Sequence, residues 1–336
     1  MSTDNHEQTE LVKHGLTISL NRPIVDFSRC TSAALTLHGL GAQDTFDHKS
    51  EFTLHPVRRI VCSSPTIVAS LDALGLCVDQ IEWVIPENAT VSLTILLSVQ
   101  GSYAVTQRIT ANAGSNAFVT IVADSAVHSH IFSLLQSDIA KDASVTIHML
   151  DLSRGFSEQS IINHLNSAGA SAYIHAASVL QGNSQQDLFT ESFHAAAFTK
   201  SDILARALVF GNAKSVSRSL VKIGQHANGS EGYEKQEALL FSQTAEADAI
   251  PNLEIHNHDV KCSHGSSVGH LDEEHIYYMQ SRGMNRAQAI ALLVEGLLAQ
   301  TLMHTPLDVQ CKTSATITER LYQAQEAQDL DPLQGK

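Results

Sequence analysis

The sequence repeats Ala89-Thr-Val-Ser-Leu93 as Ala117-Phe-Val-Thr-Ile121, Ala143-Ser-Val-Thr-Ile147 and Ala170-Ser-Ala-Tyr-Ile174, at steps of 28, 26 and 27 residues. Each unit alternates residues that would face inward and outward in a β-strand, and a second apolar strand follows each unit. Polar or glycine-containing turns precede the units. A repeat of this length predicts one structural coil per period.

Two architectures could use this period: a meander of antiparallel hairpins, or a solenoid whose strands stack in parallel from coil to coil. The repeated positions are largely Ala and Val, and aromatic residues make up only 5% of the chain. Small side chains suit the narrow stacked core of a solenoid. We therefore expect a parallel solenoid in which Ala89, Ala117, Ala143 and Ala170 occupy equivalent positions of successive coils.

Short β-leaning runs precede the repeat, including residues 16–20 and 34–38, with polar turns between them. Residues 1–10 are polar and predict a disordered tail. We expect residues 11–85 to form an N-terminal strand-rich region, 86–270 the solenoid core and 271–330 a C-terminal helical subdomain. The fold class is therefore dominated by β-structure, with α-helices at the C-terminal end.

The hydrophobic period changes from that of strands to that of helices near Glu274. Asp272 or an adjacent acid can cap a first helix, which Gly283 would end, and Asn285 would begin a second. The second helix would carry Ala289, Ile290, Leu293, Val294, Leu297, Leu298 and Leu302 on one face until Pro306 ends it. Thr316-Ile-Thr-Glu319 resembles a capping box and predicts the start of a last short helix. Packed on the end of the solenoid, these helices would shield an open sheet edge.

The charge and cysteine content of the 336 residues exclude several classes of partner. With 21 Lys plus Arg against 35 Asp plus Glu, the net charge is -14, which disfavours nucleic acid and anionic membrane surfaces. Residues 1–10 have neither the basic start nor the apolar run of a signal peptide. Five scattered cysteines, at positions 30, 62, 77, 262 and 311, fit a reducing compartment. These features predict a cytoplasmic protein.

Residues 251–274 hold most of the side chains that could bind a metal ion. In an extended chain, alternation would place His256, His258, Cys262 and His264 on one face. Thiolate and imidazole ligands suit zinc, copper or iron better than calcium or magnesium. The spacing matches no closed zinc motif, and Asn257 could break the strand. A plain surface role for each histidine therefore remains the alternative.

The same residues resemble a known family. Pro251-x-Leu-Glu-Ile255, Asp259-Val-Lys-Cys-Ser-His-Gly265 and Gly269-x-Leu-Asp-Glu-Glu274 are similar to the signature of the SufB/SufD family of iron–sulfur cluster assembly proteins, in its SufD-like form. Ser281-Arg-Gly283 and the Ala-rich segment up to Leu302 continue the likeness. The resemblance implies a right-handed parallel β-helix flanked by helices.

The resemblance also implies a function. The chain would be a non-catalytic scaffold subunit that pairs with a SufB-like subunit, or with a second copy, through the C-terminal end of the β-helix. A SufC-like ATPase would dock on the C-terminal helices, where we expect Arg286 and Glu295 to remain accessible. Cys262 and His264 match the Cys and His of the motif and would hold a transient iron–sulfur cluster shared with the partner. The resemblance gives His256 and His258 no role, so they are possible additional metal ligands.

Two other functions fit parts of the sequence. The first is a stand-alone metal-binding module, for zinc or iron, that uses the His-rich stretch. The second is a polysaccharide-processing β-helix enzyme, which the single Trp and the missing secretion signal disfavour. The chain contains no P-loop, His-Glu-x-x-His or Gly-x-Ser-x-Gly motif, and we identify no catalytic residues.

Overall fold

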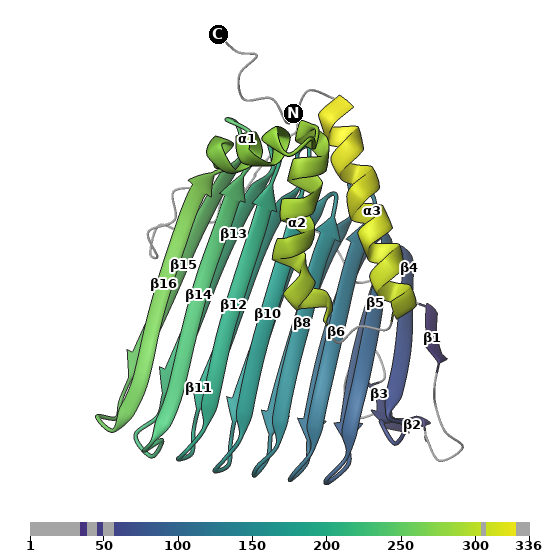
Figure 1. The fold of residues 1–336 in the computed structure, drawn as a ribbon. Helices are drawn as coiled ribbons and strands as arrows, with labels where there is room; N and C mark the ends of the chain where they lie inside the picture. The colour runs from purple at the N-terminus through teal and green to yellow at the C-terminus, as the bar shows by residue number, and fades with distance from the viewer. Residues whose placement is uncertain (1–33, 39–45, 50–56, 304–306, 327–336) are drawn as a thin grey trace, which may run out of the picture.

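The structure is a computed structural model that describes residues 34–38, 46–49, 57–303 and 307–326. Its main body is a solenoid of parallel strands, with three helices packed on one side (Figure 1). The expected parallel arrangement is therefore confirmed. The residues of the predicted tail, the run 16–20 and Cys30 lie outside the described ranges.

The strands of the solenoid form two ladders. The first contains β4 (Thr66–Ile85), β5 (Thr90–Ala111), β6 (Asn116–Ser125), β8 (Ser144–Ser153), β10 (Ser171–Leu180), β12 (Lys200–Val209), β14 (Ser230–Leu240) and β16 (Val260–His270). The second continues from the later half of β5 through β7 (His130–Ile139), β9 (Phe156–Leu165), β11 (Gln185–His194), β13 (Lys214–Ile223) and β15 (Glu246–Ile255). Consecutive strands alternate between the ladders, so each coil contributes one strand to each side.

The four Ala residues were expected at equivalent positions of successive coils. This expectation is wrong for Ala117. Ala117 pairs with Val91 and Val145, so it lies two residues beyond the position shared by Ala89 and Ala143. Ser115 occupies that shared position, since the backbone N–H of Ser144 donates to its carbonyl oxygen. A shift of two residues preserves the inward-facing pattern, and periodicity alone therefore could not detect it.

The first coils consist of two strands that bend without a turn. Residues 66–75 and 76–85 of β4 pair with successive halves of β5, so parallel coils begin before the expected boundary at residue 86. The bend lies at Gly75 and Gly101, which are paired and have φ of 77° and 131°. A side chain at Gly101 would collide with the Gly75 carbonyl group. Both positions therefore need glycine.

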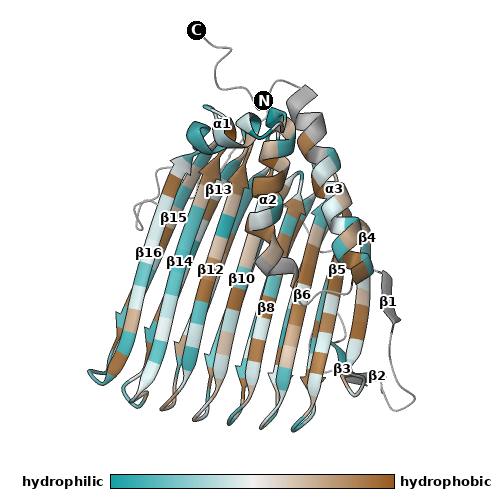
Figure 2. Cartoon of the chain, viewed as in Figure 1, coloured by the Kyte–Doolittle hydropathy of each residue, from teal (hydrophilic) through white to brown (hydrophobic). Residues whose placement is uncertain are grey.

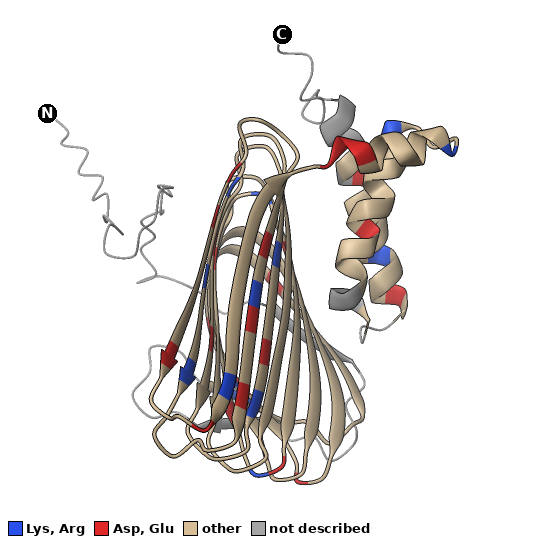
Figure 3. Cartoon of the chain, turned by 60° about the vertical axis from the view of Figure 1, so that its left-hand side comes forward, with Lys and Arg blue, Asp and Glu red and all other residues tan. Residues whose placement is uncertain are grey.

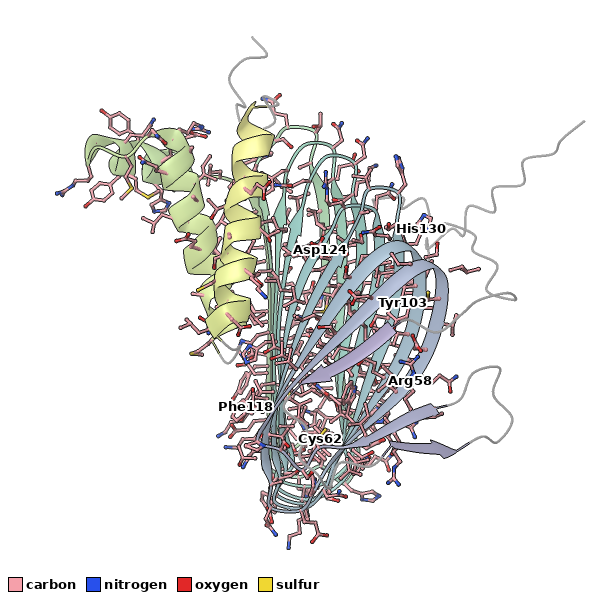
Figure 4. The ribbon with its side chains drawn as sticks, turned by 90° about the vertical axis from the view of Figure 1, so that its right-hand side faces the viewer. Arg58, Cys62, Tyr103, Phe118, Asp124 and His130 are labelled. Atoms are coloured by element: carbon pink, nitrogen blue, oxygen red, sulfur yellow. The ribbon has the colours of Figure 1, made fainter. Side chains whose placement is uncertain are left out.

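Three short strands cover the beginning of the solenoid. β1 (Ala34–His38) is antiparallel to β4, β3 (Val57–Val61) is parallel to β4, and β2 (Phe46–Lys49) is antiparallel to β3. Asp79 is buried here and binds the Arg58 guanidinium at 3.0 Å and the Tyr103 hydroxyl at 3.1 Å. Figure 4 labels Arg58 and Tyr103 at this end, where Cys62 is also buried.

The interior of the solenoid changes along its axis. The early coils are filled by small and aliphatic side chains such as Val91, Leu93 and Val119, which form one continuous core. The later coils also bury Gln186, His194 and Gln236. Figure 2 shows the same trend, since β14 carries more hydrophilic residues than β10 and β12. Buried polar groups also occur in the earlier coils, for example Asp79 and Gln107, but in the last coils they lie close to the motif that carries Cys262 and His264.

The three helices pack on a side face of the first ladder, where we had expected them at the end of the solenoid. They are α1 (Glu273–Ser281), α2 (Arg286–Leu302) and α3 (Leu307–Glu326). Their apolar residues join an outward-facing apolar surface of the sheet in one cluster that includes Leu150, Val179, Leu208, Ile290, Val294, Leu298 and Ile317. Figure 3 shows the helices as a separate layer beside the strands. None of the described helices is long and apolar enough to cross a membrane.

The helix boundaries agree with the sequence for α1 and α2 but not for α3. The Asp272 side chain caps α1, and Asn285 forms a capping box with Gln288 at the start of α2. α3 begins at Leu307, directly after Pro306, and not at Thr316. Inside the helix, the Thr316 hydroxyl donates to the Lys312 carbonyl oxygen at 3.0 Å. This local bond satisfies the Thr without a helix end, so the capping-box interpretation was wrong.

Candidate metal and partner site at the open end

The His- and Cys-containing stretch forms the last coil of the solenoid. β15 ends at Ile255 and β16 begins at Val260, so His256 and His258 lie in the connection and not on the strand that carries Cys262. Asn257 makes the turn, because its side-chain N–H groups donate to the Gln225 carbonyl at 2.8 Å and to Asn228 Oδ1 at 2.7 Å. The expectation that four ligands share one strand face is therefore wrong.

His256 and His258 are both exposed in this connection. His256 Nε2 lies 2.7 Å from Glu254 Oε1, and Lys222 Nζ lies 2.8 Å from the same oxygen. These hydrogen bonds from Lys222 and His256 lower the pKa of Glu254. His256 thus belongs to a surface network, and the structure does not bring it together with Cys262 and His264 into a metal-binding group.

Cys262 and His264 are two residues apart on β16 and face the interior of the solenoid. In the register, Cys262 pairs with Gly232 and His264 pairs with Glu234 on β14. Cys262 is half-buried and contacts the apolar core. Burial raises the pKa of its thiol, while a hydrogen bond from the Gly232 backbone N–H opposes that rise. The thiol is therefore shielded but reachable from the end of the solenoid.

Glu234 is a third polar group on this inner surface. Its carboxyl is buried, and its Oε1 lies 3.6 Å from Nδ1 of His264. Burial raises the pKa of Glu234 to about 7. The Ser219 hydroxyl and the Asn252 backbone amide oppose this rise, although neither carboxylate oxygen has a hydrogen bond of ordinary geometry. Such a carboxyl can exchange a proton or bind a cation near neutral pH.

Sequence inspection missed Glu234 because it lies 30 residues before His264, far from the motif. The coil period is the signal that could have found it, since one coil separates the two paired positions. Within the ranges that the structure describes, no three His, Cys, Asp or Glu side chains already converge as a metal site. The thiol, the imidazole and the carboxyl are nevertheless ligand types that iron accepts.

The end of the solenoid exposes apolar side chains beside these groups. Among the strands that the structure describes, β15 and β16 are the last of their ladders and pair only with β13 and β14. The inward-facing Ile255 and Val268 are 44% and 45% exposed. Because the helices pack on the side of the first ladder, they leave this end of the sheet uncovered (Figure 1). An exposed strand edge with apolar neighbours is typical of a binding surface.

The two residues that we expected to contact a partner differ in their surroundings. Both terminal nitrogens of Arg286 bind the Glu273 carboxylate, at 2.6 and 2.7 Å, so Arg286 joins α1 to α2 within the chain. Glu295 is exposed on α2. The nearby Tyr277 and Tyr278 of α1 are 75% and 59% exposed. Arg286 is therefore only partly exposed and Glu295 is exposed, and contact of either residue with a partner stays a prediction.

Comparisons with known proteins agree with the resemblance seen in the sequence. A sequence model of the family described as "SUF system FeS cluster assembly, SufBD core domain" matches residues 74–297. The chain is similar to the iron–sulfur cluster assembly protein SufD of Escherichia coli (strain K12), with 31% identity over 172 residues, which are 51% of this chain and 41% of that protein. It is also similar to the SufBD family protein ycf24 of Antithamnion sp., with 32% identity over 143 residues, 42% of this chain and 48% of the relative. The chain thus aligns with less than half the length of either relative.

Proposed function

The chain belongs to the SUF-system family of iron–sulfur cluster assembly proteins that carry the SufBD core domain, and on this premise we propose that it is a non-catalytic scaffold subunit. In this proposal it pairs with a SufB-like subunit, or with a second copy, through the last coil of the solenoid. A SufC-like ATPase docks on the C-terminal helices. Its cargo is an iron–sulfur cluster held transiently between the paired subunits.

The uncovered last coil is the observation that carries this proposal. The free edges of β15 and β16 can accept strands of a partner, and Ile255 and Val268 would then become buried. Pairing would also bring a second subunit next to Cys262 and His264. A cluster shared between two chains can be released when the chains separate, which suits an assembly intermediate.

Cys262 and His264 supply the ligands that this chain offers to the cluster. Thiolate sulfur is the usual ligand of iron–sulfur clusters, and imidazole can replace it on one iron atom. The raised pKa of the Cys262 thiol means that iron must displace its proton. Cluster binding is therefore coupled to proton release at this site.

The outer surface of α1 and α2 supports the docking of an ATPase. Tyr277 and Tyr278 are exposed on α1, and exposed aromatic residues are common anchors of protein interfaces. Glu295 adds an exposed charge on α2. The Arg286–Glu273 ion pair holds the two helices together, so that they can act as one surface. Cys262 and Cys311 are free thiols, which is consistent with a reducing, cytoplasmic setting.

Substitution of the two ligands tests the proposal. We expect Cys262→Ser and His264→Ala each to lower cluster formation on the complex purified anaerobically, with subunit pairing retained. Their effects should be less than additive, because both side chains serve one site. Iron, sulfide and zinc analysis of the same samples is the measurement. Normal cluster formation in both variants would show that Cys262 and His264 are not cluster ligands. If the purified protein contains zinc but no sulfide and no partner subunit, a stand-alone metal-binding module would be favoured.

A further inference from the structure

Glu234 occupies a position that is aliphatic in the preceding coils. Its inward-facing column in the first ladder consists of Leu93, Val119, Ile147, Ile174 and Ile203, followed by Glu234 and then His264. The five residues before Glu234 are fully buried parts of the hydrophobic core. Within this column, a carboxyl therefore first replaces an aliphatic side chain in the coil next to the proposed cluster site.

The burial of this carboxyl is compensated only in part, because the Ser219 hydroxyl and the Asn252 backbone amide offset little of its effect on the Glu234 pKa. Glu234 is 4% exposed, and neither carboxylate oxygen has a well-formed hydrogen bond. The two outward-facing glutamates of the same strand each have a cationic partner. Glu231 accepts a hydrogen bond from Lys261 at 3.1 Å, and Glu237 accepts one from Arg206 at 2.8 Å. A buried polar group without partners destabilises the fold. A ligand that binds the group would supply the missing interaction.

The distance between the Glu234 carboxylate and the His264 imidazole fits two ligands of one metal ion better than it fits a hydrogen bond. Glu234 Oε1 and His264 Nδ1 are 3.6 Å apart, which is too long for a hydrogen bond. Two ligand atoms that each lie about 2.1 Å from one tetrahedral metal ion are separated by about 3.4 Å. Only a small movement would therefore allow both atoms to bind the same ion.

The three side chains do not yet converge on one point, so Cys262 would have to move to reach the same ion. It lies two residues before His264 on the same face of β16, a spacing at which two strand residues can share one metal ion. Its register partner is Gly232, which places no side chain between the thiol and the interior. Thiolate, imidazole and carboxylate together would form a three-ligand site that Fe²⁺ or Zn²⁺ can occupy. A fourth coordination position of the ion would remain open.

We propose that Glu234 is a metal ligand, and that with Cys262 and His264 it binds one divalent iron ion at the open end of the solenoid. This inference rests on the proposed function and extends it, because it gives this chain a site for a single iron ion before a cluster forms. His264 is exposed at the end where the partner would bind, so an ion held there would remain accessible to the partner. Iron binding displaces the Cys262 proton, which passes to solvent.

Titration with Co²⁺ under anaerobic conditions tests the site, because a thiolate bound to Co²⁺ produces a charge-transfer absorption. The full chain is used with Cys311→Ser, since Cys311 is an exposed thiol. We expect one equivalent of Co²⁺ to give this absorption and Cys262→Ser to abolish it. Glu234→Gln should weaken the binding about tenfold or more. Glu231→Gln, on the same strand but facing outward, is the matched control and should leave the affinity unchanged.

Three results would overturn the inference. If Glu234→Gln binds Co²⁺ like the parent chain while His264→Ala does not, Glu234 is no ligand and the proposed Cys262–His264 site still stands. If Glu234→Gln binds normally and Glu234→Ala does not, the carboxyl is not a ligand and the side chain at position 234 only positions His264. If the parent chain gives no charge-transfer absorption, the single-iron site does not exist. Urea unfolding verifies that Glu234→Gln is folded, and we expect it to be at least as stable as the parent.

Discussion

At the scale of single residues, His194 illustrates how the later coils bury polar groups. Its Nδ1 lies 2.7 Å from Thr199 Oγ1, and its Nε2 lies 2.7 Å from Ser201 Oγ. Thr199 Oγ1 is in turn 2.8 Å from Ser230 Oγ. Burial lowers the pKa of His194 to about 4. The neutral ring is thus satisfied by hydroxyl groups, and a charged ring would be poorly solvated.

Stability should therefore depend on pH through His194. Between pH 6.5 and about 4 the unfolded chain binds a proton that the folded chain does not, so the stability from the neutral ring falls as the pH decreases. At pH 5 this loss is about 2 kcal/mol. We expect His194→Gln to show a correspondingly smaller decrease in unfolding free energy between pH 7.5 and pH 5. Urea unfolding at both pH values measures it, and equal decreases in both proteins would exclude the effect.

The site residues were only partly predictable, for a reason that lies in the turn. Alternation correctly placed Cys262 and His264 on one face of a strand. It failed for His256 and His258 because the strand is interrupted there by a turn. The Asn257 side chain donates to the Gln225 carbonyl and accepts from the Asp259 backbone N–H, and these bonds stabilise the turn. Glu234 was not found, since its proximity to His264 depends on stacking between coils and not on sequence distance.

At the scale of elements, local chemistry predicted the boundaries best where a single side chain decides them. Asp272 and Asn285 begin α1 and α2 as expected, because each accepts a hydrogen bond from a free backbone N–H of the first turn. The repeat gave the coil period but not the register at Ala117. That register follows from hydrogen bonds between coils, such as the bond from the Asn116 N–H to the Ala89 carbonyl.

The bend between the two ladders should tolerate no side chain at Gly101. Gly101→Ala would introduce a Cβ that collides with the Gly75 carbonyl at a positive φ. We expect it to lower the unfolding free energy by more than about 2 kcal/mol. Gly296→Ala is the control, because open space surrounds this position in α2, and it should raise stability by about 0.5–1 kcal/mol. Urea unfolding of the full chain compares them, and similar small effects at both positions would contradict the role of the bend.

At the scale of the whole molecule, the position of the helices separates two surfaces. The sequence predicted the helices and their apolar face but placed them on the end of the solenoid. The outward-facing apolar residues Leu150, Val179 and Leu208 explain the difference, since they give α2 and α3 a side face to cover. Outward-facing positions of successive coils align only when the register is known, so this surface could not be recognised in the linear sequence. The last coil consequently remains available to a partner.

This separation predicts that the two proposed partners can be disrupted independently. Val268→Glu and Ile255→Glu place a charge on the uncovered last coil, and we expect each to weaken pairing with the SufB-like subunit at least about tenfold, equivalent to about 1.4 kcal/mol. Glu295→Lys on α2 should instead reduce copurification of the ATPase and leave pairing unchanged. Leu74→Glu is the control, since Leu74 is 70% exposed on β4 in the first coils, far from both surfaces along the solenoid.

Copurification with each partner, together with the mass of the purified complex, measures both effects. If the natural partner is a second copy of this chain, Val268→Glu should change the purified protein from a dimer to a monomer, with the ATPase still bound. Loss of both partners in one folded variant would mean that the ATPase contacts the paired subunits jointly, and the two surfaces would then not be independent. Separate losses require a scaffold whose helices lie beside the solenoid, because helices that covered its end would couple ATPase docking to subunit pairing.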